Sequence, residues 1–392
     1  MKVAIIHDWF VGGGAERVVL ELHRMYPKAP IYTAYCNDEW RQKLSSTQII
    51  TSYMQKWPFS KLRKFLPILR GLWFSRLDLS DYDLVISSSG AEAKFVKAGR
   101  KNGQMVNKKI IGKWKMTNGK SDVKQPLHIS YIHAPTHYYW SRYEEYLAQP
   151  GFGFFDPLAS LGLKLLVGPM RRWDYKAAQR PDHLIANSNF TKEQIKKHYN
   201  RDSYVIHPPV DVDRFKGYGK PAEQRHGFVT AGRQAPYKKI DLAVEAATSL
   251  KVPLAVIGRG PEHRWLKKLA GRNVTFLTKV SDEDIARHFG EAKAFIFPGV
   301  DDFGIVAVEA MAAGAPVIAY RAGGALDYIN KDTGLFFNEQ TPESLAKVMD
   351  GFNQKTFSHS KITEQAAKFS PQTFQKEISN FIKRMQSSIS AK

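Results

Sequence analysis

The chain has 392 residues, a length that accommodates two domains with a hydrophobic core each. Its hydrophobic fraction of 43% is typical of a globular protein, and its single cysteine, Cys36, excludes an internal disulfide and fits a reducing compartment. We expect neither a signal peptide, because Lys2 leads directly into a strand-like segment, nor a membrane span, because no apolar run reaches about 18 residues.

The net charge of +21 is concentrated in two segments. Residues 56–76 contain six basic residues, no acidic residue and several large aromatic ones, while residues 94–124 contain ten basic residues against one acidic residue and read as a loop or basic hairpin. A mixture of basic and bulky apolar residues suits an anionic membrane surface, for which the candidate contacts are Lys61, Arg63, Lys64 and Trp73. A solvated surface explains the charge as well. We expect no nucleic-acid partner, because no binding-module signature accompanies the charge.

The first half of the chain alternates strand-like and helical segments. Residues 2–7 form a predicted strand, three glycines follow at 12–14, and a helix is expected over 15–25. A glycine run between strand and helix lets the backbone approach a ligand closely, although a plain tight turn is also possible. The run is not a dinucleotide-binding fingerprint, because Arg17 stands where that pattern needs glycine.

Further strands are predicted over residues 82–87, 128–133, 184–188 and 205–209. His133 ends the second of these, at the edge of a parallel sheet where ligands bind, although a lone histidine there is more often structural. The sequence becomes polar and rich in glycine and proline between about 215 and 227. We therefore predict domains over residues 1–215 and 216–368, with a terminal segment over 369–392.

The second half begins again with a strand, over residues 227–231, and a helix over 240–250. The loop between them carries Arg233 and Lys238. Two cations five residues apart suit a diphosphate, because arginine can bind it bidentately and lysine supplies a mobile point charge. Two more strands, over 254–258 and 274–277, lead to a turn with Val280 and to Ser281, which begins a helix-capping pattern.

Residues 295–329 contain the most specific pattern in the chain. A buried strand ends at Pro298, a loop carries Asp301 and Asp302, and a helix with little polar surface follows until Gly314. The start of that helix suits an anion. Glu309, on an otherwise apolar helix, needs polar partners and could bind paired hydroxyl groups of a ribose or sugar, although a capped core helix with solvated acids is the alternative.

These residues resemble the signature of family 4 glycosyltransferases. The family has two acidic residues separated by seven others, Phe-Gly between them, and Glu-Ala-Met-Ala at the end; here Phe303-Gly304 and residues 309–312 match, and Asp301 replaces the first glutamate. The resemblance implies a retaining enzyme with the α/β GT-B fold. In that fold two Rossmann-like domains face one cleft, and a C-terminal helix, here residues 369–388, crosses back to the first domain.

The resemblance also implies roles for single residues. Donor-binding positions carried over from the family are Gly13, Gly14, Arg233, Lys238, Val280, Phe303, Gly304, Ile305 and Glu309. Of these, Arg233 and Lys238 would hold the diphosphate, Glu309 the ribose, and Val280 the base. Asp301, with backbone N–H groups near Gly304, would hold sugar hydroxyls.

The segment around His133 resembles a subgroup of GDP-mannose-dependent mannosyltransferases of polysaccharide assembly, in which the histidine contacts the transferred sugar. That subgroup usually has arginine where this chain has His137. Together with the basic, aromatic segment at 56–76, which suggests a peripheral protein at the inner face of the cytoplasmic membrane, this predicts a glycan or lipid-linked acceptor. We expect no metal and no cofactor, because the Asp-x-Asp pairs fall in ordinary structural positions and no zinc spacing occurs.

Besides a basic nucleic-acid binder, which would show salt-sensitive affinity for RNA or DNA, three alternatives stay open at this point. The donor could be a UDP- or dTDP-sugar, the protein could be a nucleotide-sugar epimerase of the same architecture, or it could bind a nucleotide-sugar without turnover. Acceptor-dependent product formation distinguishes a transferase from an epimerase, and donor binding without turnover would indicate the binding protein. The sequence says nothing about the oligomeric state.

Overall fold

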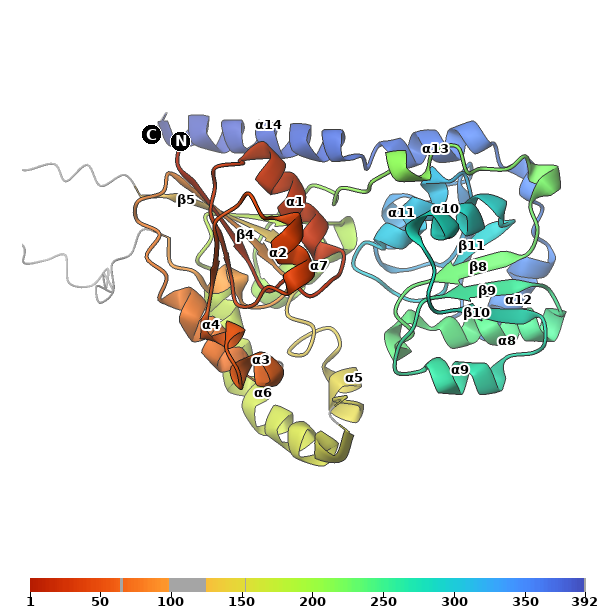
Figure 1. Ribbon diagram of the computed structural model, residues 1–392, viewed down its shortest axis with the longest axis horizontal. Helices are drawn as coiled ribbons and strands as arrows, with labels where there is room; N and C mark the ends of the chain where they lie inside the picture. The colour runs from red at the N-terminus through yellow and green to blue at the C-terminus, as the bar shows by residue number, and fades with distance from the viewer. Residues whose placement is uncertain (64–65, 99–124, 152, 391–392) are drawn as a thin grey trace, which may run out of the picture. The chain divides into compact units, whose positions relative to one another are not determined.

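A computed structural model describes residues 1–63, 66–98, 125–151 and 153–390 of the chain. These residues form two compact units (Figure 1). Unit 1 consists of Met1–Ala186, Gln194–Tyr204 and Lys383–Lys392, and unit 2 of Asn187–Glu193 and Val205–Ile382. Helix α14 (Pro371–Ser390) therefore contributes to both units. The domain limits at 215 and 368 stay predictions.

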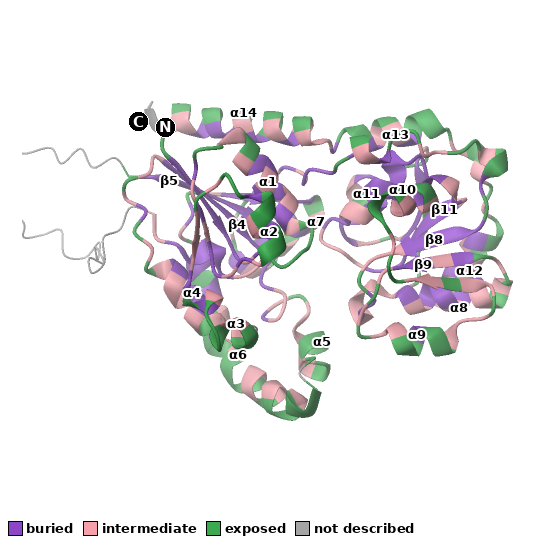
Figure 2. Ribbon diagram, viewed as in Figure 1, coloured by how far each residue is buried: buried purple, intermediate pink, exposed green. Residues whose placement is uncertain are grey.

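Unit 1 is built on a seven-stranded sheet with the order β3-β2-β1-β4-β5-β6-β7. Its strands are β1 (Val3–His7), β2 (Ile31–Thr33), β3 (Ile49–Thr51), β4 (Leu84–Ser89), β5 (Leu127–Ile132), β6 (His183–Ala186) and β7 (Tyr204–Val205). The pairs from β3 to β6 are parallel. Strands β1, β4 and β5 are buried along their whole length, as expected for a parallel sheet covered on both faces (Figure 2).

The helices of unit 1 are α1 (Ala15–Met25), α2 (Asp38–Lys43), α3 (Phe59–Leu62), α4 (Pro67–Ser75), α5 (Tyr143–Ala148) and α6 (Asp156–Ala178), and α7 (Asn189–Tyr199) is shared between the two units. Among the helices of the described residues, none has both the length and the apolar character needed to cross a bilayer.

Unit 2 is built on a six-stranded parallel sheet with the order β10-β9-β8-β11-β12-β13. Its strands are β8 (Phe228–Ala231), β9 (Leu254–Ile257), β10 (Val274–Leu277), β11 (Ala294–Phe297), β12 (Val317–Tyr320) and β13 (Gly334–Phe337). Its helices are α8 (Ile240–Leu250), α9 (His263–Leu269), α10 (Asp282–Glu291), α11 (Ile305–Ala312), α12 (Pro342–Asp350) and α13 (His359–Ala367). Two apolar clusters pack on its sheet, one including Phe295 and the other Ile296, because successive strand residues face opposite sides.

The two parallel sheets with their helices confirm the predicted α/β architecture. Helices α1 and α8 begin and end where the sequence predicted them. Ser281 accepts a hydrogen bond from the Asp284 backbone N–H, and Gly314 follows α11 with a φ of +79°, so both predicted helix-end signals are confirmed.

One predicted strand is much shorter than expected. Only Tyr204 and Val205 of that region form a strand, β7. The prolines at 208 and 209 have no backbone N–H to donate to a neighbouring strand, so the ladder cannot extend through them.

His128 is the clearest pH-sensitive group in the core of unit 1. Its imidazole is 2% exposed on β5, and its Nε2 lies 2.9 Å from the Ser87 hydroxyl oxygen. Burial, helped by the positive charge of Arg180, lowers its pKa from 6.5 to about 3. His128 is thus neutral when folded at pH values where the unfolded chain binds a proton.

We therefore expect this histidine to destabilise the fold on acidification. The folded pKa lies below the unfolded one, so His128 does not reduce the free energy of unfolding above pH 6.5. Between pH 6.5 and the folded pKa, only the unfolded chain binds the proton, and the free energy of unfolding falls by about 1.4 kcal/mol per pH unit. His128→Gln should lose less stability between pH 7 and pH 4 than the wild type, as measured by urea unfolding. Parallel stability profiles of the two proteins would contradict this assignment.

Candidate functional site

Two loops of unit 2 meet because β8 and β11 are neighbours in a parallel sheet. Each strand ends at the same edge, and each is followed by a loop that leads into a helix. The loop after β8 contains Arg233 and Lys238, and the loop after β11 contains Asp301 and Gly304. The topology therefore gathers three of the predicted donor-binding positions, together with the predicted sugar contact Asp301, at one edge of the sheet.

Lys238 and Asp301 form an ion pair between these loops. The two side chains keep 18% and 12% of their exposure, so both are partly shielded but reachable from solvent. The Lys238 ammonium also lies 5.9 Å from the centre of the Phe297 ring. The pair thus holds a cation at the edge of the sheet, beside the beginning of α11.

The loop before α11 requires glycine at position 304. Gly304 has a φ of +94°, and a β-carbon there would lie 2.7 Å from both the Phe297 ring and the Tyr328 hydroxyl. Since Gly304 precedes the first residue of α11, its neighbours Ile305 and Val306 lie in the first turn, where backbone N–H groups have no partner within the helix. These donors and the helix dipole favour an anion or sugar oxygens.

Glu309 lies on α11 among buried apolar residues and is 7% exposed. Phe303 is buried and belongs to the core beside Tyr328, so only its backbone is suited to contact a ligand. Val280, between β10 and α10, is half-buried and packs against the same core cluster. The roles of these three residues stay predictions.

Gln234 is a residue of this site that the sequence did not indicate. It is fully buried next to the exposed Arg233, and its Nε2 donates to the Gly258 carbonyl oxygen at 2.8 Å. Its Oε1 lies 2.7 Å from the Nδ1 atom of His263. Gln234 thereby joins the loops after β8 and β9 and fixes the backbone that carries Arg233. A polar residue directly after the arginine was the only signal in the sequence.

In unit 1, strands β1, β4 and β5 lie side by side and end at one edge. Asp8 follows β1 and accepts hydrogen bonds from the backbone N–H groups of Gly90, Ala91 and Ala93, at 2.7, 2.9 and 2.6 Å. This carboxylate therefore orders the turn that follows β4. No pattern in the sequence indicates this role of Asp8.

His133 follows β5 at this edge and is half-buried. Its Nε2 lies 2.7 Å from the Ser88 hydroxyl oxygen, and its ring lies 5.2 Å from that of Tyr131. The Ser88 backbone carbonyl lies 3.2 Å from Nδ1 of His7. Ser88 thus connects two histidines at the ends of β1 and β5, and its hydroxyl fixes the orientation of the His133 ring.

Gly13 and Gly14 are exposed in the loop after β1. The buried Glu16 accepts hydrogen bonds from the backbone N–H groups of Val11 and Gly12, at 3.2 and 2.9 Å. Because α1 begins directly after Gly14, this contact holds the glycine run against the start of the helix.

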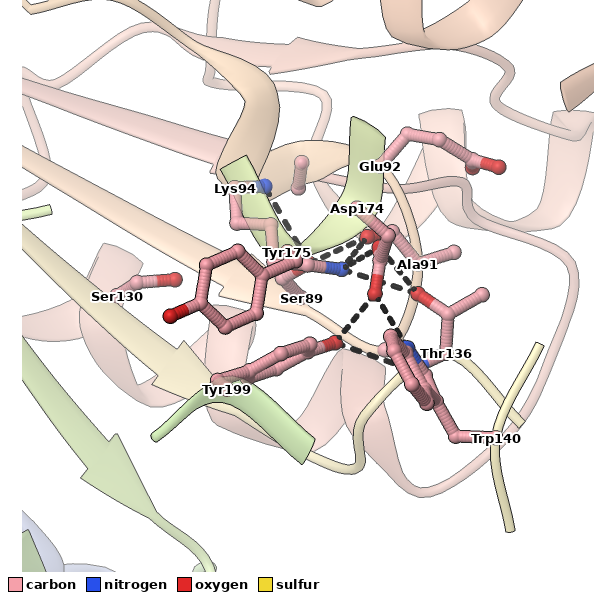
Figure 3. A network of polar contacts seen from close by, with 12 residues as sticks. Ser89, Ala91, Glu92, Lys94, Ser130, Thr136, Trp140, Asp174, Tyr175 and Tyr199 are labelled. Atoms are coloured by element: carbon pink, nitrogen blue, oxygen red, sulfur yellow. Dashed lines mark hydrogen bonds and ion pairs between the residues drawn. The ribbon is translucent and has the colours of Figure 1, made fainter. Parts of the chain in front are cut away.

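A buried polar network centred on Asp174 of α6 contacts the segment that follows His133 (Figure 3). Its carboxylate accepts hydrogen bonds from Thr136, Trp140 and Tyr199 at 2.9, 2.8 and 2.7 Å. The Lys94 ammonium lies 2.8 Å from the same carboxylate and donates to the Thr136 hydroxyl at 3.0 Å. The network therefore binds the segment that follows His133 to three other parts of unit 1.

A second buried ion pair supports the same segment. Arg70 and Glu92 pair at 2.9 Å, and the Tyr138 hydroxyl donates to Glu92. Burial, reinforced by the nearby Glu92 charge, raises the pKa of Tyr138 well above its usual value, which keeps the phenol a donor. Arg70 thus has a structural role, although it belongs to the basic segment at 56–76.

The predicted membrane contacts differ in their exposure. Lys61 is exposed, Arg63 stacks on the Tyr35 ring with 4.4 Å to its centre, and Trp73 is half-buried against Phe74. Lys64 lies outside the described residues, as does most of the basic segment at 94–124. Within the described ranges, no three His, Cys, Asp or Glu side chains gather as around a metal ion.

Comparison with known proteins places this geometry in context. Residues 211–369 match the family model "Glycosyl transferases group 1", and residues 124–214 match "Glycosyltransferase Family 4". A D-inositol 3-phosphate glycosyltransferase of Streptomyces scabiei is 32% identical over 206 residues, which cover 44% of this chain and 46% of that protein. One from Mycobacterium tuberculosis is 31% identical over 176 residues, covering 38% and 36%. The chain thus spans less than half the length of these relatives.

Solved structures resemble the whole chain. Anabaena Alr3699/HepE in complex with UDP-glucose has a TM-score of 0.65 at 18% identity, covering 98% of this chain and all of the other. WaaG, a glycosyltransferase involved in lipopolysaccharide biosynthesis, has a TM-score of 0.59 at 16% identity, covering 97% and 99%. At these identities the likeness shows the fold, which is that of glycosyltransferases with two Rossmann-like domains.

The Asp174 network gives a prediction about stability. Asp174→Ala leaves the Lys94 charge, 1% exposed, without its carboxylate, which should lower the free energy of unfolding by about 3–5 kcal/mol. Lys176→Ala, at an exposed position of the same helix, should change it by less than about 0.5 kcal/mol. Urea unfolding measures both values.

The double variant Lys94→Met/Asp174→Leu removes both charges together. It should recover much of the stability that Asp174→Ala loses, because no charge then remains buried alone. A double variant as unstable as Asp174→Ala would show that the lost hydrogen bonds from Trp140 and Tyr199, or packing, and not the uncompensated charge, cause the loss.

Proposed function

We propose that this protein is a retaining glycosyltransferase that moves a sugar from a nucleoside-diphosphate sugar to a hydroxyl group. The observation that carries the proposal is the Lys238–Asp301 ion pair at the edge of the unit 2 sheet, beside the beginning of α11. The cation and the N–H groups of the first helical turn suit the diphosphate of such a donor, and the carboxylate suits the hydroxyl groups of its sugar.

In this proposal the protein acts mainly through electrostatics. When the bond between the anomeric carbon and the diphosphate breaks, the diphosphate keeps the electron pair and gains negative charge. Lys238 and Arg233 stabilise that charge, and a preorganised cation of this kind contributes most in the transition state. The acceptor hydroxyl attacks on the face that the diphosphate leaves, and its proton passes to the leaving phosphate oxygen.

The other predicted site residues bind the ribose and the sugar of the donor. Glu309 binds the ribose, Asp301 binds sugar hydroxyls, and His133 of unit 1 contacts the transferred sugar. The ion pair also orients Asp301, since its carboxylate is held by Lys238. No metal is needed in this scheme, because Arg233 and Lys238 supply the positive charge.

We propose GDP-mannose as the donor, on the resemblance of the segment around His133 to mannosyltransferases. A uridine nucleotide is the second candidate, because Alr3699/HepE, which has the same fold, was solved with UDP and with UDP-glucose. The proposed acceptor is a glycan or lipid-linked sugar at the inner face of the cytoplasmic membrane, and its support is the basic, aromatic segment at 56–76.

Thermal stability in the presence of nucleotides tests this proposal without knowledge of the acceptor. We expect one of GDP, UDP, dTDP and ADP to raise the melting temperature, since a ligand at 100 times its Kd adds about 2.7 kcal/mol. NAD should have no effect. Lys238→Ala should abolish the shift, because the diphosphate loses its cation.

Lys239→Asn is the matched control, because it removes the neighbouring charge while asparagine tolerates the left-handed conformation of that residue, φ +51°. It should keep the nucleotide shift. If no nucleotide stabilises the protein, or if Lys238→Ala and Lys239→Asn behave alike, the donor site is assigned wrongly. Binding without sugar transfer to any acceptor would instead favour a nucleotide-sugar-binding protein.

A further inference from the structure

Helix α6 differs from the other long helices in the distribution of its exposed residues. Its C-terminal half is packed into unit 1 through Met170, Asp174 and Ala177, all of which are buried. Its N-terminal half carries large apolar side chains that are open to solvent. Figure 2 shows this change from buried to exposed along the helix.

The exposed apolar residues form one stripe. Phe154, just before the helix, and Leu158, Leu161 and Leu165 are 93%, 68%, 54% and 70% exposed. The spacing of three and four residues between the leucines places them along one side of α6, and Phe154 directly precedes that helix. A contiguous exposed stripe of large apolar residues is unusual on a soluble surface and marks a place where another apolar surface binds.

Positive charge accompanies this stripe. Lys164 and Arg172 are exposed on α6 itself. Helix α4, at the end of the basic segment, contacts the base of α6, because a β-carbon on Gly71 would lie 2.6 Å from the Trp173 ring. That basic segment contains no acidic residue and exposes Lys61 and, at 76%, Trp57.

We propose that the stripe on α6 inserts into the interface of an anionic lipid bilayer. The helix lies on the membrane and does not span it, with its leucines among the acyl chains and its basic residues at the headgroups. Trp57 suits the headgroup level, where indole rings concentrate. The carboxylates of Glu144 and Glu145 on α5 and of Asp156 on α6 oppose this attraction, so the net attraction comes from the basic residues of α6 and of the segment at 56–76.

This inference deepens the proposed function and rests on it for the choice of a bilayer over another apolar partner. It adds a surface outside the basic segment, on the helix that also carries Asp174. Because Asp174 and Arg171 bind the segment after His133, through Thr136 and the Tyr139 carbonyl, the membrane-bound helix and the predicted sugar contact belong to one packed part of unit 1.

A fluorescent label tests the insertion directly in the full chain. Leu158→Cys is labelled with the environment-sensitive dye NBD, which emits at shorter wavelength in an apolar medium. Cys36 does not compete, because it is fully buried and burial raises its thiol pKa to about 11. Vesicles of phosphatidylglycerol and phosphatidylcholine should shift the emission to the blue. The same label on Leu335→Cys, an exposed leucine of unit 2, should show no shift.

A second experiment measures the contribution of the stripe to binding. The variant Leu158→Ser/Leu161→Ser/Leu165→Ser should bind these vesicles at least tenfold more weakly than the wild type in sedimentation, with an unchanged melting temperature because the leucines are exposed. Trp265→Ser, an exposed aromatic residue of unit 2, is the control and should bind like the wild type.

Three outcomes overturn the inference: no blue shift at position 158, triple-variant binding equal to the wild type, or a wild-type dimer in analytical ultracentrifugation that the triple variant abolishes. The last outcome assigns the stripe to a second copy of the chain. Failure here is distinct from failure of the proposed function, because the nucleotide-dependent melting shift does not involve vesicles.

Discussion

The parallel pairing of β8 with β11 is the constraint on which the candidate donor site depends. It brings together two loops whose charged residues, Lys238 and Asp301, lie 63 positions apart in the chain. Neither residue alone indicates a ligand. Together they lie at the carboxyl end of the sheet, beside the first turn of α11, as a partly shielded cation and carboxylate. In the proposed function the cation binds the diphosphate of a nucleotide-sugar and the carboxylate binds its sugar hydroxyls.

In unit 1, too, charged residues distant in the chain come together, but here they are buried and hold the structure in place. Its buried ion pairs, Lys94–Asp174 and Arg70–Glu92, lie beneath the segment that follows His133. Buried charges cost free energy unless they are paired and hydrogen-bonded, and here every contact joins a different part of the chain. These contacts hold the segment in one conformation. A fixed position of this kind suits the predicted role of His133 in contacting the transferred sugar.

Helix α6 belongs both to the buried network of unit 1 and to the proposed membrane surface. One end supplies Asp174 to the buried network, while the other presents leucines to solvent. The exposed end would be costly without a partner surface, and the basic residues nearby favour an anionic one. A sugar acceptor held in a membrane would then be approached by a protein whose proposed lipid contacts lie on the helix that also anchors the segment after His133, the predicted sugar contact.

The sequence alone determined the alternation of strands and helices, the ends of α1, α8 and α11, and the identity of most candidate residues, because periodicity, glycine and proline signals and short motifs are local. Only the tertiary structure decided which residues meet. Asp8, Gln234, Asp174 and Lys94 carry no local signal, and Arg70 reads as a surface charge although it is buried. The sequence does not tell whether the apolar residues of α6 are buried, and only the tertiary structure shows them to be exposed, because burial depends on neighbours distant in the chain.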